Sequence, residues 1–584
     1  MKKIIYGLLW ITTLPLAAQT PTNNIVFKSP LEPPISLSGN FGTIRTNHFH
    51  SGLDIRTDGH IGKSVFCVAD GYVSRISISH TGYGNALYIT HPDGFISVYG
   101  HLNCFCPRIQ SYVENYQYSH ETFELDINLP NDVFAVKQGE EIAVSGDSGF
   151  SGGPHLHFEL RNAQTGEYVN PADYFRKFFL DSIPPKAYGV KVYPQKGNGV
   201  VEGSSRVHAY FFNYIDGVCM LNDTIRAWGD IGLAVKAYDF SENSYYRLGI
   251  RQIKLLVDSM EIFKSDLESF SDKETRYVNA WTDSGDSNFK RGHYIKSFIL
   301  PGNGLHMLHS NEKKGIISIN EERVYQIQYI LIDDFGNESH YSFVIKGERQ
   351  QIPTTIQEKK GDLLLKCLQK NIISLDGFEL IIPQGNLYED ISINPYIKKS
   401  LVVIANDYRI SRNSFQLHSF CPLKIRISKD ISKDKQKYYI TNKVGIRYLG
   451  GTYENGWIKG ETRELGLFSV AIDRTTPKII PISKNSWART GKIVFKISDS
   501  GSGIKTYKGM IDGKFILFKC DLNRCLTCKW KELPFNLDGK YVLTLEAEDH
   551  CGNKAVYKTS FNTKIVYKVI RKHNYRYHKR KYRK

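Results

Sequence analysis

The most informative stretch of this sequence is Gly152-Gly-Pro-His155-Leu-His157-Phe-Glu159-Leu160. Alternate side chains of an extended strand share one face of a sheet. We therefore expect the two histidines and the glutamate to point to one side, while the three apolar residues that alternate with them face a core. The two imidazoles would then lie side by side, as a metal-dependent hydrolase requires.

Three earlier segments carry related chemistry: Asn47-His-Phe-His50-Ser-Gly-Leu-Asp54, Tyr99-Gly-His101-Leu102 and Gly146-Asp-Ser-Gly149. His50 and Asp54 can reach one ion if the Ser and Gly between them form a bend. By strand alternation, Tyr99 and His101 should share a face. Nine of the 18 histidines lie between His48 and His157, which makes this region the strongest functional signal in the chain.

These residue types fit zinc chemistry. A zinc ion held by three protein ligands keeps a fourth position for water, lowers the pKa of that water and polarises a carbonyl group. Two histidines and one aspartate suffice as ligands. A second pair of histidines could deprotonate the water and hydrogen-bond the oxyanion that develops during the reaction.

The four segments together resemble the lysostaphin/LytM-type zinc endopeptidases, which cut peptidoglycan peptides. The resemblance runs from about Gly39 to Pro171 and includes the H-x-x-x-D, Y-G-H-L, G-x-[ST]-G and G-P-H-L-H-F-E segments in family order. It implies an antiparallel β-sheet metallopeptidase domain with one Zn²⁺. It also implies that His50, Asp54 and His157 bind this zinc, while His101 and His155 assist the water and the oxyanion.

Three functions remain open at this point. The first is an exported zinc metalloendopeptidase that hydrolyses amide bonds in the peptide stems or cross-links of peptidoglycan. The second is a catalytically silent envelope protein that binds wall peptides or activates another hydrolase, and the third is a metalloprotease that acts on surface proteins. The sequence does not identify the peptide bond that is cut. It also does not show which of His101 and His155 acts as the general base.

Other histidines and the cysteines give weaker signals. His48 lies two residues before His50, but its spacing to Asp54 does not fit the family, and we interpret His60, His80, His91 and His120 as ordinary polar residues. Cys520, Cys525, Cys528 and Cys551 could form a four-thiolate zinc site, although disulfides or free thiols fit their spacing better.

Composition favours a mostly β protein of several domains. At roughly 150 residues per domain, 584 residues suggest about four domains. The 41% hydrophobic and 23% charged residues are typical of globular proteins and exclude a largely disordered chain. Tyr and Phe are abundant, at 36 and 31 residues, whereas Met is scarce at 5, which favours strands over long helices.

Polar, proline-containing breaks and short alternating strands suggest a domain plan. The β-sheet metallopeptidase domain should be followed by several β-sandwich (Ig-like) modules, two of which contain the pattern D-x-x-G-N, at Asp333–Asn337 and Asp549–Asn553. The predicted order is a signal peptide (1–18), the zinc peptidase domain (19–185) with an insertion or long loop (103–135), a β-sandwich (186–350), a β module (351–475), an Ig-like sandwich (476–563) and a basic tail (564–584).

The two ends of the chain indicate export and a charged tail. Lys2 and Lys3 precede an apolar run that ends in Ala17-Ala18, the layout of a secretory signal peptide, so we expect a protein of the periplasm or cell envelope. Residues 564–584 contain ten basic residues, and subtracting these from the net charge of +17 leaves about +7 for the body. We expect no nucleic-acid partner; the tail could bind anionic envelope polymers or lipids, or be simply solvated. The oligomeric state is left open.

Overall fold

The structure is a computed structural model. It describes residues 26–563 except 216–217, 222–223, 243, 284–291, 354–361, 400–403, 413–414, 429, 431, 444–446 and 522. The predicted signal peptide and basic tail therefore lie outside the described residues. The prediction of a mostly β protein built from antiparallel sheets is confirmed. No helix in the described part of the chain combines the length and the apolar character needed to cross a membrane.

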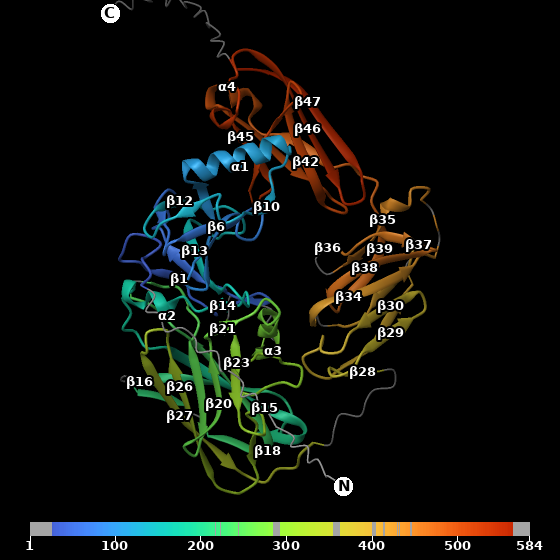
Figure 1. The fold of residues 1–584 in the computed structure, drawn as a ribbon. Coiled ribbons are helices and arrows are strands. Elements are labelled where there is room, and N and C mark those ends of the chain that lie inside the picture. Colours follow the sequence, from blue (N-terminus) through green and yellow to red (C-terminus); the bar gives the residue numbers. More distant parts are fainter. Residues whose placement is uncertain are drawn as a thin grey trace, which may run out of the picture.

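The N-terminal unit (residues 26–179) is built around one antiparallel sheet, shown in blue and cyan in Figure 1. Its central strands follow the order β1-β4-β13-β8-β7-β6-β10. Their bounds are Leu37–Gly39 (β1), Leu53–Arg56 (β4), Gly71–Ile78 (β6), Asn85–Thr90 (β7), Phe95–Gly100 (β8), Leu125–Asn128 (β10) and His155–Asn162 (β13). Strand-like residues at 86–90 and 95–102, on either side of the turn at 91–94, predict a hairpin from the sequence, and the pairing of β7 with β8 confirms it.

A smaller sheet and two short strands complete this unit. The sheet has the order β5-β12-β9, with Ser64–Phe66 (β5), Leu102–Phe105 (β9) and Glu141–Ser145 (β12). A separate pair consists of Ile44–Arg45 (β2) and His48–Phe49 (β3). Two further strands, Ala135–Val136 (β11) and Tyr168–Val169 (β14), extend the main sheet, and a short helix (α2) spans Ala172–Phe175.

Residues 103–135, predicted to be an insertion or a long loop, contain a helix and a strand, so the long-loop alternative is wrong. Pro107–Ser119 forms the helix α1, and strand β10 follows it. Proline occupies the first turn, where its missing N–H removes no hydrogen bond. Ile109, Val113 and Gln117 repeat at four-residue spacing and are the buried residues of this helix. A narrow stripe with two apolar residues thus holds an otherwise polar segment against the sheet.

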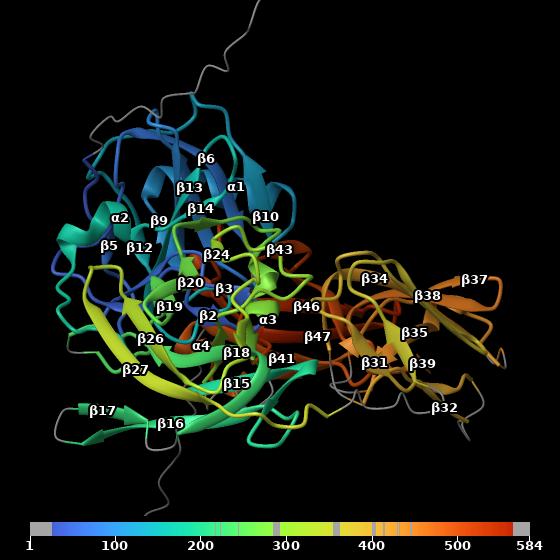
Figure 2. The same ribbon diagram turned by 90° about the horizontal axis from the view of Figure 1, so that it is seen from below.

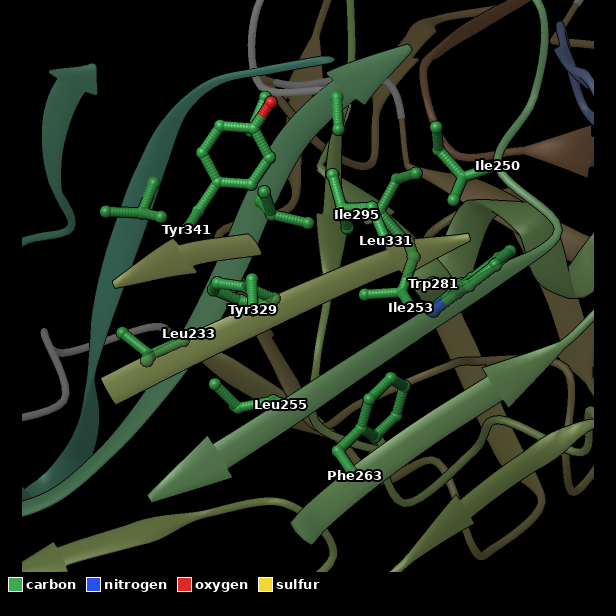
Figure 3. Close-up of a cluster of buried hydrophobic side chains, with 14 of the residues drawn as sticks. Leu233, Ile250, Ile253, Leu255, Phe263, Trp281, Ile295, Tyr329, Leu331 and Tyr341 are labelled. Atoms are coloured by element: carbon green, nitrogen blue, oxygen red, sulfur yellow. The ribbon is translucent and has the colours of Figure 1, made fainter. Parts of the chain in front are cut away.

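The first module (residues 186–347, green in Figure 1) is a sheet of 12 strands. Its main path is β17-β16-β15-β18-β27-β26-β19-β20-β24. The bounds are Lys186–Val201 (β15), His208–Ile215 (β16), Val218–Leu221 (β17), Ile225–Tyr238 (β18), Gln252–Val257 (β19), Met260–Asp266 (β20), Thr282–Asp283 (β22), Tyr294–Lys296 (β23), Leu308–Ser310 (β24), Ile317–Ile319 (β25), Val324–Ile332 (β26) and Glu338–Gly347 (β27). Figure 3 shows part of its core, in which Leu255, Phe263 and Tyr329 lie against these strands.

The core of the first module reaches into the N-terminal unit. Phe41 and Phe49 are each 1% exposed and belong to the core cluster of the first module. The ring of Phe49 lies 5.4 Å from that of Phe270 and 5.8 Å from that of Trp281, at the end of helix α3 (Val278–Trp281). Strand β14 also pairs with β21 (Ser269–Phe270). The predicted boundary near 185 stays a prediction, but packing continues across it.

The second module (residues 363–472) consists of two sheets of five strands and one strand pair. The sheets have the orders β29-β30-β34-β38-β37 and β32-β33-β39-β35-β36. The bounds are Leu363–Leu365 (β28), Asn371–Leu375 (β29), Phe378–Ile382 (β30), Ile391–Ile393 (β31), Tyr396–Lys398 (β32), Asp407–Arg409 (β33), Gln416–Arg426 (β34), Tyr438–Asn442 (β35), Arg447–Tyr448 (β36), Thr452–Glu454 (β37), Trp457–Glu464 (β38) and Leu467–Ile472 (β39). In Figure 2 this module stands to one side of the other parts.

The third module (residues 478–562) is a pair of four-stranded sheets around a core that contains Trp487 and Phe495. The bounds are Lys478–Pro481 (β40), Lys492–Ser498 (β41), Ile504–Ile511 (β42), Lys514–Ile516 (β43), Lys519–Cys520 (β44), Cys525–Lys529 (β45), Lys540–Asp549 (β46) and Lys554–Asn562 (β47), with the short helix α4 at Trp487–Thr490. Two facing antiparallel sheets are the arrangement of a β-sandwich.

The four parts follow one another around a ring that closes on itself (Figure 1). The third module returns to the N-terminal unit, where the Tyr507 hydroxyl lies 2.5 Å from Nε2 of His80 and Phe515 meets Tyr118 of α1 with a ring separation of 6.0 Å. Lys508 also forms an ion pair with Glu121. His80, interpreted above as an ordinary polar residue, is therefore part of an interface between segments far apart in sequence.

Candidate metal centre

Strand register brings two of the predicted ligands together. His157 on β13 pairs with Asp54 on β4 and, on its other side, with Gly100 on β8. Directly paired residues of antiparallel strands place their Cβ atoms about 4.5–5.5 Å apart on one face of the sheet. The carboxylate of Asp54 consequently lies 3.0 Å from Nδ1 of His157.

The third predicted ligand comes from the bend between β3 and β4. Nε2 of His50 lies 2.8 Å from Oδ1 of Asp54 and 3.1 Å from Nδ1 of His157. One ligand atom from each of these three residues lies within 4.8 Å of the other two. The structure thus brings together the three residues that the family resemblance assigned to zinc.

The outer nitrogens of these imidazoles have fixed acceptors. Nδ1 of His50 donates to the backbone carbonyl of Asn40 at 2.8 Å, and Nε2 of His157 donates to Oε1 of Glu159 at 2.9 Å. Each neutral ring therefore turns a lone pair inward, toward the other ring and toward the carboxylate of Asp54. Two lone pairs and a carboxylate in contact require a cation or a proton among them, so this donor set fits a zinc ion.

The pKa values of the buried cluster also indicate that it needs a cation or a proton. Burial raises the pKa of Asp54, but the neighbouring charge of His50 and hydrogen bonds from the surrounding histidines outweigh it and hold the pKa well below its usual value. Burial lowers the pKa of His157, but its hydrogen bonds to Asp54 and Glu159 dominate and raise the pKa to about 9. The cluster therefore retains a proton when no cation is bound.

The two predicted catalytic histidines flank the cluster. Nδ1 of His101 lies 2.8 Å from the carbonyl of Ser148, and Nδ1 of His155 lies 2.7 Å from the carbonyl of Gly153. This leaves Nε2 of His101 as an acceptor, whereas Nε2 of His155 lies 3.3 Å from Oδ1 of Asp54. Burial lowers the pKa of His155, but the hydrogen bond and charge of Asp54 outweigh it and raise the pKa. The centroids of the two rings are 4.7 Å apart. Burial and the neighbouring His157 and His155 lower the pKa of His101 to about 3, so its ring is neutral.

The prediction that Tyr99 and His101 share a face is wrong. Tyr99 is fully buried in the core of the N-terminal unit, where its hydroxyl accepts a hydrogen bond from the backbone N–H of Val68 at 3.1 Å. Strand β8 ends at Gly100, and His101 has a left-handed backbone with φ of 57°. This turn out of the strand, rather than strand alternation, aims the imidazole at the cluster. Such a strained residue is common at functional sites.

Sequence reasoning missed the supporting role of Glu159. Its fully buried carboxylate accepts hydrogen bonds from His157, from Ser51 and Tyr83 at 2.5 Å each, and from Arg161 at 2.8 and 2.6 Å. Burial raises the pKa of Glu159, but the charge of Arg161 and the hydrogen bond from His157 hold it far below its usual value. Its placement two residues after His157 on one strand face was the available signal.

The remaining candidates lie outside the cluster. His48 is exposed and bonds to the carbonyl of Thr46, whereas His91 is buried between the carbonyl of Asp70 and the hydroxyl of Ser97. Nδ1 of His120 bonds to the carbonyl of Tyr116. Among the described residues, no cysteine belongs to a potential metal cluster and Cys520, Cys525, Cys528 and Cys551 are free, so the four-thiolate site is not formed.

Comparison with known families supports a peptidase-type domain. The family described as Peptidase family M23 matches residues 48–118, which include His50, Asp54 and His101. The family described as Zu5-like domain matches residues 362–473, in the second module. The N-terminal unit is thus an M23 peptidase domain of the lysostaphin/LytM type.

Individual proteins are similar to a limited share of the chain. The DD-carboxypeptidase/endopeptidase Mpg of Neisseria meningitidis is 32% identical over 22% of this chain and 23% of its own length. The murein hydrolase activator NlpD of Escherichia coli is 31% identical over 21% of this chain and 26% of its own length. A mutant catalytic domain of the M23 protein EnpA from Enterococcus faecalis is 25% identical, over 24% of this chain and 89% of that one, with a TM-score of 0.18. The chain covers 20% to 35% of the length of the first curated relatives that it matches.

Proposed function

We propose that this protein is an exported zinc metalloendopeptidase that hydrolyses amide bonds in the peptide stems or cross-links of peptidoglycan, and that it acts in the periplasm or cell envelope. One observation carries the proposal. Two inward-facing imidazole lone pairs meet the carboxylate of Asp54, and the rings of His101 and His155, each held through Nδ1, stand beside them. This is a complete set for metal-dependent hydrolysis.

Each residue of the set has a proposed role. Nε2 of His50, the carboxylate of Asp54 and Nδ1 of His157 hold the zinc, and Asn40 and Glu159 fix the orientation of the two rings. When bound, zinc supplies a Lewis acid that polarises the substrate carbonyl and lowers the pKa of water.

His101 and His155 handle protons and charge. Both rings are held through Nδ1, so Nε2 of each faces the reacting atoms. The ring that is neutral can accept a proton from water, and the ring that already carries a proton on Nε2 can hydrogen-bond the oxyanion. The hydrogen bonds to Ser148 and Gly153 fix the rings and so supply orientation before the substrate arrives. Which ring acts as the base stays open.

The named relatives support two readings of this site. Mpg carries the description of a carboxypeptidase and endopeptidase, and NlpD that of a murein hydrolase activator. The second description favours, as an alternative, a catalytically silent activator of another wall hydrolase. The presence of all five residues, His50, Asp54, His101, His155 and His157, favours catalysis, because an activator needs none of their hydrogen-bond geometry.

Digestion of purified peptidoglycan by the zinc-loaded full chain tests the proposal. Mass spectrometry of the released fragments should show newly cleaved amide bonds. The His101→Ala variant should keep its zinc while turnover falls at least about a hundredfold, because it removes a group that touches water or oxyanion. Stimulation of a separate wall hydrolase without cleavage by the protein alone would instead establish the activator. Cleavage of surface proteins but not of wall peptides would establish the third function.

The proposal also names the molecules that the protein should bind. Peptidoglycan peptides are the expected substrate, and residues 564–584 supply the positive charge that could hold the protein near anionic envelope polymers or lipids. A protein without this tail should cleave soluble wall peptides at an unchanged rate and bind intact envelopes less at low salt, because surface charge attraction is screened by salt.

A further inference from the structure

Three aspartates meet where the N-terminal unit joins the first module. Asp181 lies in the proline-containing linker, Asp239 directly follows β18, and Asp333 directly follows β26. Each offers a carboxylate oxygen, and these oxygens lie within 4.8 Å of one another. None of the ion pairs between described residues includes any of the three.

Asp239 is the unusual member of this group. It is only 2% exposed, and its Oδ1 is buried without a hydrogen-bond partner. Oδ2 of Asp181 is likewise buried and without a partner. Burial, together with the nearby charges of Asp333 and Asp181, raises the pKa of Asp239 to about 9. A buried carboxylate without a partner is unfavourable unless a cation or a proton compensates it.

Three hydrogen bonds fix the orientation of the Asp333 carboxylate. Its Oδ1 accepts hydrogen bonds from the backbone N–H groups of Phe335 and Asn337 at 2.8 and 2.9 Å, and its Oδ2 accepts one from the side chain of Asn337 at 2.7 Å. These three donors belong to the D-x-x-G-N turn. The turn therefore fixes one carboxylate beside two others.

The chain builds the same arrangement a second time. Asp473, Asp499 and Asp549 form an equivalent group at the junction of the second and third modules, and Oδ1 of Asp499 again has no partner. Asp549 accepts hydrogen bonds from Cys551 N at 2.9 Å, Asn553 N at 2.8 Å and Asn553 Nδ2 at 2.7 Å. An arrangement repeated at two junctions points to a shared purpose.

We propose that Asp181, Asp239 and Asp333 bind a calcium ion that fastens the linker to the first module. The site offers only oxygen ligands, which hard cations prefer, whereas zinc favours nitrogen and sulfur. Calcium accepts six to eight oxygens in an irregular arrangement, so three carboxylates completed by water or backbone carbonyls suit it. The unpartnered oxygens of Asp239 and Asp181 are the ligands that this assignment explains.

The proposed calcium site is connected to the metal centre through neighbouring residues. Asp334, the next residue after Asp333, accepts a hydrogen bond from the side chain of Asn40 at 2.8 Å. The carbonyl of Asn40 in turn accepts the Nδ1 proton of His50 at 2.8 Å. A cation that fixes the D-x-x-G-N turn at Asp333 would therefore also help to fix the position of His50, a proposed zinc ligand.

Calorimetric titration of the zinc-loaded full chain with CaCl₂, in buffer freed of calcium, tests this inference. The Asp239→Asn variant, which keeps the shape of the side chain, should bind one calcium fewer than the wild type and should gain less thermal stability from calcium. Glu242→Gln is the matched control, because Glu242 is an exposed acidic residue beside the linker and outside the group; its calcium stoichiometry should equal that of the wild type.

Three outcomes would overturn the inference. These are no calcium binding by the wild type at millimolar concentration, an unchanged stoichiometry in Asp239→Asn, and binding of Mg²⁺ as tight as that of Ca²⁺, which would refute the choice of calcium. If Asp239→Asn does not fold, the same loss of one calcium is expected of Asp181→Asn, whose side chain is more exposed.

Discussion

His157 is one of the three proposed zinc ligands, and its inward lone pair lies beside the carboxylate of Asp54. Replacing it with alanine removes both a ligand and the link between Asp54 and Glu159. We expect His157→Ala to lose zinc and activity together, because a three-ligand site that loses one ligand does not keep its geometry. Elemental analysis of the purified variant measures this. His48→Ala, which removes an exposed histidine of the same region, should retain zinc; full zinc occupancy in His157→Ala would refute the ligand assignment.

The carboxylate of Glu159 orients His157 without belonging to the ligand set. In Glu159→Gln one carboxylate oxygen, an acceptor, becomes an NH₂ group, which is a donor. This group then faces other donors, either from Arg161 or from Ser51 and Tyr83. We expect zinc affinity to fall about 10- to 100-fold, as for other partners of metal-bound histidines. Competition with a zinc-binding dye measures the affinity, and circular dichroism shows whether the variant is folded. Glu167→Gln on the same hairpin is the control, and an affinity equal to that of the wild type in Glu159→Gln would contradict the role of this carboxylate.

The positions of the candidate residues could be predicted from the sequence because they lie in short motifs with strand spacing. The way each ring is held could not be predicted in the same way. The acceptors of His50 and His101 are backbone carbonyls of Asn40 and Ser148, and any residue type supplies a carbonyl. The left-handed backbone of His101 likewise has no signature in a sequence without glycine at that position.

The loop that contains Ser148, whose carbonyl accepts the hydrogen bond from His101, depends on the close contact between Gly149 and Gly84. Gly149 has φ of 75°, and a Cβ atom there would lie 2.2 Å from the backbone nitrogen of Gly84. We expect Gly149→Ala to destabilise the protein by more than about 1–2 kcal/mol, the cost of the left-handed backbone alone, and to lower activity by displacing Ser148. Differential scanning calorimetry and peptide hydrolysis measure the two effects.

Gly152 provides the matched control for this loop. Its φ is not in the left-handed region, and a Cβ atom would meet nothing within 4 Å. Gly152→Ala should therefore leave both the melting temperature and the activity close to those of the wild type. Equal effects of the two substitutions would mean that general loop flexibility, rather than the contact with Gly84, is responsible.

Element prediction succeeded where alternation was regular and failed where it was sparse. The hairpin of β7 and β8 is bounded by a clear turn, and both strands were predicted. Helix α1 was missed because only three of its residues, Ile109, Val113 and Gln117, are buried, and one of these is polar. A narrow stripe of this kind is hard to distinguish from the polar sequence of a loop.

For the whole molecule, the shared core changes what a truncated protein should do. The sequence delimits the zinc peptidase domain as residues 19–185, and a domain delimited in this way is expected to fold alone and bind zinc. In the structure Phe41 and Phe49 are buried against the first module, and Phe49 precedes His50 directly. Exposing both would forfeit about 1.5–3 kcal/mol for each phenylalanine. We now expect residues 26–350 to bind zinc stoichiometrically and residues 26–185 to aggregate or bind zinc weakly.

Size-exclusion chromatography and elemental analysis of the two fragments check this expectation. A monomeric, fully zinc-loaded fragment 26–185 would show that the shared core is dispensable. This packing could not be predicted from the sequence, because a phenylalanine that will be buried has the same pattern whether its partners lie in its own unit or in the next one. Domain boundaries drawn from linkers therefore do not reveal which cores continue across them.

The contact between the third module and the N-terminal unit joins two parts of one chain, which raises the effective concentration of each part at the other. Tyr507 and His80 are 427 positions apart, yet the intervening modules hold them in reach, so their association is intramolecular. A contact of this kind persists even when its intrinsic affinity is weak, because tethered partners experience local concentrations of about a millimolar. The same module supplied as a separate chain would compete poorly for that surface. Cleavage anywhere in the ring would thus weaken an interface that the cut itself does not touch.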